Sequence, residues 1–108
     1  MSAAGVRRTL RFRLDLEQII DDYRTDAGTE IAVRFVKSFE QALTRITAFP
    51  SLGSHRFTEF SDLADIRAAA VPSFPYSIFY LFRDEIVVGL RVLHHRRDLP
   101  ELLREPDA

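Results

Sequence analysis

The chain has 108 residues, the length of one domain, and 46% of them are hydrophobic, which is enough for a core. Fifteen Lys and Arg residues face sixteen Asp and Glu residues, so the formal net charge is -1. This balance argues against a general nucleic-acid-binding protein, which usually carries a basic excess. The absence of cysteine excludes disulfides, thiolate chemistry and cysteine zinc sites.

The sequence shows no internal division. It carries no repeat, low-complexity run or linker, so we expect a single domain over residues 1–108, with its core at about 9–99 and loose ends. Residues 1–14 lack the apolar run of a signal peptide. No segment approaches the roughly 18 apolar residues that a membrane span requires. We therefore expect a cytoplasmic protein.

The first half of the sequence predicts one strand and two helices. Residues 9–14 alternate apolar and charged side chains, the period of a strand with one face in water. A helical apolar stripe follows, at Leu16, Ile19, Ile20 and Tyr23. Asp15 is the expected N-cap of this helix. After Gly28 a second helical stripe covers residues 31–46, so an antiparallel helical hairpin is expected over 15–48.

The second half predicts three strands in close succession. They are expected at residues 66–71, 76–82 and 86–93. Residues 51–65 form a polar connection before them, and a short helix is expected around 99–104. The order strand, two helices, three strands indicates an α+β domain, β-α-α-β-β-β, with the helical hairpin on one face of an antiparallel sheet.

The strand predicted at 76–82 is apolar on both faces. Its even-numbered residues include Tyr76, Ile78 and Tyr80, and its odd-numbered residues include Phe79 and Leu81. One face can pack against the helices. The other face needs a different cover, for which a partner chain is one candidate.

Five motifs, in this order along the chain, resemble the RelE/ParE superfamily of toxins and its ParE branch in particular. Residues 15–19 (DLEQI) are similar to the D-L-x-x-I of the first helix, and residues 49–53 (FPSLG) to the family's F-P-x-L-G. Ile66-Arg67 resembles the hydrophobic-Arg pair that opens the second strand. Residues 75–80 (PYSIFY) resemble the Y-x-I-F-Y strand. Residues 90–99 (LRVLHHRRDL) resemble the closing R-V-L-H-x-x-R-D-L.

One departure concerns the start of the first helix. The family usually places about one helical turn between its first strand and the D-L-x-x-I motif. In this chain the predicted strand runs directly into Asp15.

The resemblance implies two different activities. ParE-type toxins bind DNA gyrase and block it, whereas RelE-type toxins cleave messenger RNA in the ribosome with basic groups and a tyrosine around the scissile phosphate. This chain has Ser77 where the cleaving branch has an arginine, and no lysine in residues 63–65. Leu102 or a neighbour stands at the position of the terminal tyrosine. Only Arg96 or Arg97 remains as an equivalent.

The resemblance therefore implies a gyrase inhibitor that is not an enzyme. Its partner would be a cognate ParD-like antitoxin with a dimeric DNA-binding head and a tail that orders on the toxin. The chain itself would bind neither nucleic acid nor membrane. Two alternatives remain open: a ribosome-dependent endoribonuclease of the RelE type, and an inactive relative that only binds antitoxin.

Polar residues on the second and last predicted strands and just after the last one are the candidate contacts with target or antitoxin: Arg67, Arg91, His94, His95, Arg96, Arg97 and Asp98. For Asp98 the interpretation favours a structural pair with Arg67, Arg91 or Arg97. Adjacent histidines on a strand point to opposite faces, so we expect no metal site. We also expect no cofactor and no catalytic residue. Asp15, Asp21 and Asp22 are expected on a solvated helix face.

Overall fold

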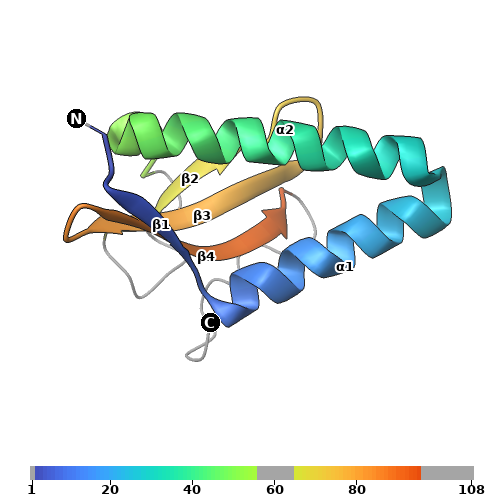
Figure 1. Cartoon of the computed structure of the whole chain (residues 1–108), viewed down its shortest axis with the longest axis horizontal. Helices are drawn as coiled ribbons and strands as arrows, with labels where there is room; N and C mark the ends of the chain where they lie inside the picture. The colour runs from blue at the N-terminus through green and yellow to red at the C-terminus, as the bar shows by residue number, and fades with distance from the viewer. Residues whose placement is uncertain (1, 56–64, 96–108) are drawn as a thin grey trace.

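A computed structural model describes residues 2–55 and 65–95 of the chain. The elements are β1 (Gly5–Arg8), α1 (Leu10–Ala27), α2 (Thr29–Ala48), a 3₁₀ turn η1 (Pro50–Leu52), β2 (Arg67–Ala70), β3 (Tyr76–Arg83) and β4 (Ile86–His94). The two helices form a hairpin over one face of the sheet (Figure 1), which confirms the predicted α+β fold. Neither described helix is long and apolar enough to cross a membrane.

The sheet is mixed, because its first strand runs parallel to its last. The strand order is β1-β4-β3-β2. β2, β3 and β4 form the predicted antiparallel meander. β1 pairs in parallel with the first half of β4, from Gly5 opposite Ile86 to Arg8 opposite Gly89. The prediction of a purely antiparallel sheet was wrong here, because the helices and the meander together supply the long connection that parallel strands require.

The predicted first strand at residues 9–14 was also wrong. Leu10 begins α1, and the hydroxyl of Thr9 caps the helix by accepting the backbone N–H of Phe12 at 3.3 Å. The apolar alternation was misleading because only Phe12 is buried, whereas Leu10 and Leu14 are 61% and 49% exposed. The strand precedes this segment, at Gly5–Arg8.

The new helix start also corrects the position of the D-L-x-x-I motif. Asp15 lies in the second turn of α1 and is not its N-cap. The helical turn that the family places before this motif is therefore present in the chain. The residues of the predicted connection at 56–64 and of the predicted helix at 99–104 lie outside the described part of the structure.

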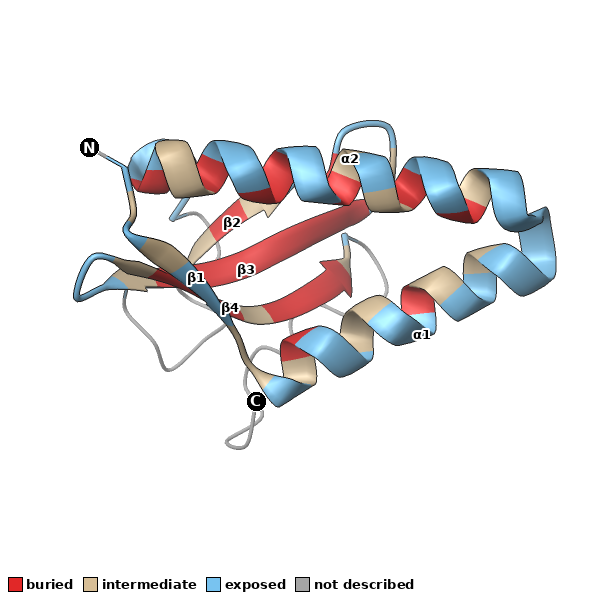
Figure 2. Cartoon of the chain, in the orientation of Figure 1, coloured by how far each residue is buried: buried red, intermediate tan, exposed pale blue. Residues whose placement is uncertain are grey.

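Apolar side chains lie on both faces of the sheet. The cluster between helices and sheet includes Phe12, Phe35, Phe39 and Tyr80, and the second cluster includes Phe79 and other side chains of the opposite face. In Figure 2 the buried residues lie on β2, β3 and β4 and on the helix faces turned toward the sheet, whereas the outer faces of the helices are exposed. Phe79 is 0% exposed, so the second face of β3 does not need a partner chain to account for its apolar character.

Gly89 lies where a side chain of α1 packs closely against the sheet. A Cβ atom at this position would lie 2.7 Å from the ring of Phe12. That ring is fully buried and packs against the ring of Phe39, with 5.8 Å between the two centroids. The β-bulge between Phe79 and Tyr80 lies directly opposite, where Tyr80 pairs with Gly89. The glycine is required by this packing and not by its backbone conformation.

We expect Gly89→Ala to lower the free energy of unfolding by about 1–3 kcal/mol, because the added methyl group overpacks the Phe12 site. The matched control is Gly5→Ala on the neighbouring strand, where a Cβ atom would lie at an ordinary 3.6 Å from Cδ1 of Ile86. The control should change stability by about 0.5 kcal/mol or less. Denaturant unfolding of both variants tests this, and equal losses would contradict the close approach.

Candidate functional site

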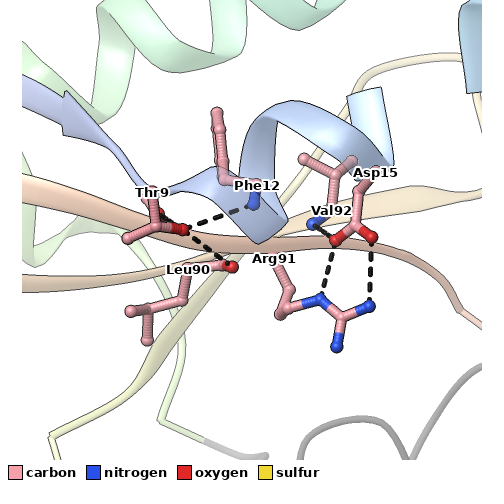
Figure 3. A network of polar contacts seen from close by, with 7 residues as sticks. Thr9, Phe12, Asp15, Leu90, Arg91 and Val92 are labelled. Atoms are coloured by element: carbon pink, nitrogen blue, oxygen red, sulfur yellow. Dashed lines mark hydrogen bonds and ion pairs between the residues drawn. The ribbon is translucent and has the colours of Figure 1, made fainter. Parts of the chain in front are cut away.

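Asp15 and Arg91 form a nearly buried ion pair between α1 and β4. The Nε of Arg91 donates to Oδ2 of Asp15 at 2.8 Å, and its Nη2 donates to Oδ1 at 3.0 Å (Figure 3). The same Oδ2 accepts the backbone N–H of Val92 at 2.9 Å. The side chain of Arg91 is 4% exposed and that of Asp15 is 16% exposed. Asp15 was expected on a solvated face, and this prediction was wrong.

Thr9 completes this network at the edge of β4. Its hydroxyl donates to the backbone oxygen of Gly89 at 2.9 Å, and its own N–H donates to the same oxygen at 3.2 Å. β1 ends one residue earlier, so from this point no strand of residues 2–55 or 65–95 lies along this edge of β4. Thr9 and Asp15 hydrogen-bond to β4 in place of that strand. Arg91, a predicted contact residue, thus lies inside the protein and holds Asp15.

A second polar cluster surrounds the hydroxyl of Tyr80. This hydroxyl donates to the backbone oxygen of Pro50 at 2.6 Å and accepts the N–H of Gly53 at 2.9 Å. Burial raises the pKa of Tyr80 above its ordinary 10.0, so the hydroxyl stays protonated and remains a donor. Arg67, another predicted contact residue, is half-buried and donates to the backbone oxygen of Gly53 at 2.9 Å. Three of the five motifs therefore meet here.

The end of β4 carries the remaining described candidates, His94 and His95. The ring of His94 stands edge-on to that of Tyr76, with 5.3 Å between the centroids. It lines a small pocket beside the C-terminal turn of α1, together with Asp22 and Asp26. His95 is exposed and its Nε2 lies 2.7 Å from Oγ of Ser77, a hydrogen-bond distance. Arg96, Arg97 and Asp98 lie outside the described residues.

The Ser77–His95 contact does not amount to a hydrolytic site. Ser77 is 5% exposed, so its hydroxyl is shielded from a substrate. Within residues 2–55 and 65–95 no carboxylate bonds to the other nitrogen of His95, as a catalytic triad requires. The same part of the chain holds no group of three potential metal ligands. The arrangement can fix the end of β4 against β3, and it leaves His94 and His95 at the rim for contact with another molecule.

Replacing Asp15 with alanine should lower the free energy of unfolding by about 3–5 kcal/mol, because Arg91 would remain as an unpaired buried charge. Glu40→Ala is the matched control. It removes the Arg8–Glu40 pair, which has a similar length of 2.9 Å but exposed side chains. An exposed pair contributes about 1 kcal/mol or less. Urea unfolding measures both losses, and a small loss for Asp15→Ala would contradict its structural role.

Comparison with known proteins agrees with the fold and with the motifs. Residues 6–99 match the family described as ParE toxin of type II toxin-antitoxin system, parDE. The chain is 33% identical over 95 residues to Toxin ParE3 of Caulobacter vibrioides, covering 87% of this chain and 89% of that protein. It superimposes with a TM-score of 0.70 on a chain of the chromosomal ParDE TA system from P. aeruginosa, at 20% identity, covering 83% of this chain and 94% of that one. The chain belongs to the ParE toxin family of type II toxin–antitoxin systems.

Proposed function

We propose that this ParE-family toxin inhibits DNA gyrase by binding it, and that a cognate ParD-like antitoxin neutralises it in the cytoplasm. Family membership supports the toxin role, and the family description pairs ParE with ParD. The observation that carries the choice of binding over catalysis is the state of Ser77. It stands where the cleaving branch has an arginine, and it is buried and bonded to His95.

The described polar residues of the family motifs also favour binding. Arg91 is paired with Asp15, Arg67 donates to backbone oxygens, and Tyr80 is held between Pro50 and Gly53. Groups engaged in this way are not free to activate a ribose hydroxyl or to stabilise a phosphorane. Arg96 and Arg97 would be the only counterparts of the basic catalytic groups, and losing even one such donor costs about a hundred- to a thousandfold in rate.

The rim at the end of β4 is the proposed contact surface for target or antitoxin. It comprises His94 and His95, followed along the chain by Arg96, Arg97 and Asp98. Protein–protein binding needs only a few anchor residues within a wide surface, so this role does not require the proton-transfer geometry that catalysis demands. The net charge of -1 is consistent with a toxin that acts on a protein without binding nucleic acid itself.

Two assays on one preparation separate binding from catalysis. We expect the purified toxin to inhibit supercoiling by DNA gyrase and to leave messenger RNA intact on translating ribosomes. The alternative activity predicts the reverse: codon-positioned cuts that Arg96→Ala or Arg97→Ala abolishes, while gyrase runs normally. A toxin that is silent in both assays but still binds the antitoxin would be an inactive relative, and gyrase inhibition would then be rejected.

The antitoxin is expected to stabilise the toxin, because a ligand that binds only the folded state shifts the unfolding equilibrium. At a free concentration one hundred times its Kd, the added stability is about 2.7 kcal/mol. The measurement is the Tm of the toxin, titrated with the DNA-binding protein encoded by the adjacent reading frame. A Tm that does not move at saturating antitoxin would reject the proposed partnership.

A further inference from the structure

An open groove lies between the outer flank of α2 and the turn that joins β2 to β3. Its volume is about 550 Å³, room for a few side chains. The turn rises beside α2 in Figure 1 and is tied to the helix where Oγ of Ser38 donates to the backbone oxygen of Pro72 at 2.6 Å. The ring of Phe74 also lines the groove, and it stands edge-on to the buried ring of Phe35 with 5.2 Å between centroids. The groove is therefore anchored to the core.

The groove is positively charged and has no compensating carboxylate. Arg34 and Lys37 line it. Among the residues that the structure describes, no Asp or Glu lines the groove. Both cations are exposed, and in the part of the chain that the structure describes neither forms an ion pair. Arg8 and Arg24 differ in this respect, since Arg8 pairs with Glu40 and Arg24 with Asp21.

Apolar side chains accompany these charges. Ile31 lies one helical turn before Arg34 on α2, and Phe74 faces the groove from the turn. A surface that combines unpaired cations with half-buried apolar side chains complements a segment that alternates carboxylates with apolar side chains. Nucleic acid fits less well, because two cations neutralise few phosphates and the chain as a whole is slightly acidic.

We infer that this groove is a docking site for an acidic segment of the antitoxin, with carboxylates at Arg34 and Lys37 and an apolar side chain over Ile31 and Phe74. The inference rests on the proposed function, because it takes the antitoxin as the partner. It separates the docking surface from the rim at the end of β4. An antitoxin tail in this groove would hold the toxin by residues that are not part of the rim proposed as a contact surface at the end of β4.

The test reverses both charges of the groove, with Arg34→Glu and Lys37→Glu in one variant. The matched control is Arg7→Glu with Arg13→Glu, because both residues are exposed, form no ion pair among the described residues and flank the start of α1, where carboxylates are tolerated. Calorimetric titration with the full-length antitoxin measures Kd at 50 and 300 mM salt. We expect the groove variant to bind about 10- to 100-fold more weakly and with less salt dependence, and the control to stay within about twofold.

Each outcome bears on a different claim. Wild-type toxin that does not bind the antitoxin rejects the proposed partnership itself. Wild-type binding that the groove variant retains in full overturns the docking site and leaves the partnership standing. If the wild type is a dimer on gel filtration and the groove variant is not, the groove belongs to a second copy of the chain. If the wild type binds a labelled single-stranded DNA and the groove variant does not, the groove belongs to nucleic acid. Either result would overturn the inference. If the Glu variant fails to fold, Arg34→Gln with Lys37→Gln replaces it and should weaken binding about fivefold or more.

Discussion

The ion pair between Asp15 and Arg91 fixes how the helices sit on the sheet. β1 ends at Arg8, so no strand among the described residues continues it along the second half of β4, and the backbone groups at this edge need other hydrogen-bond partners. The first turns of α1 supply them, with Thr9 at the backbone oxygen of Gly89 and Asp15 at the N–H of Val92. A helix that serves as an edge must lie close to the sheet. Gly89 allows this close packing, because it has no Cβ atom and so leaves room for the ring of Phe12.

Most of the described residues in the motifs that identify the family form contacts that stabilise the fold of this chain. Residues 15–19 meet residues 90–99 through the Asp15–Arg91 pair, and residues 49–53 meet Arg67 and Tyr80 around one phenol. Such contacts are demanding in geometry, because a buried polar group must find its partner or lose about 1–3 kcal/mol. A fold held in this way can keep its motifs while its surfaces change. Family membership therefore specifies the scaffold more firmly than the target.

The sequence predicted the elements whose patterns are long and failed where the pattern was short. The stripe of α2 over residues 31–46 and the hairpin of β3 and β4 are correct, because many residues support each period. Leu10, Phe12 and Leu14 gave only three alternating positions, too few to distinguish a strand from an amphipathic helix with two exposed leucines. That error hid Asp15, because its inner position is visible only once the helix start is known.

Long-range polar contacts were beyond the reach of sequence patterns for a different reason. Asp15 and Arg91 are 76 positions apart, and no local period relates them. The same holds for charge. A net charge of -1 conceals arginines of different kinds: Arg91 is buried with its carboxylate, Arg8 is paired at the surface, and Arg34 has no anionic partner in the described chain. Only the last kind can attract an acidic partner, since paired charges have already been neutralised within the fold. Recognition by a nearly neutral protein therefore depends on which charges the fold leaves unpaired, and not on their sum.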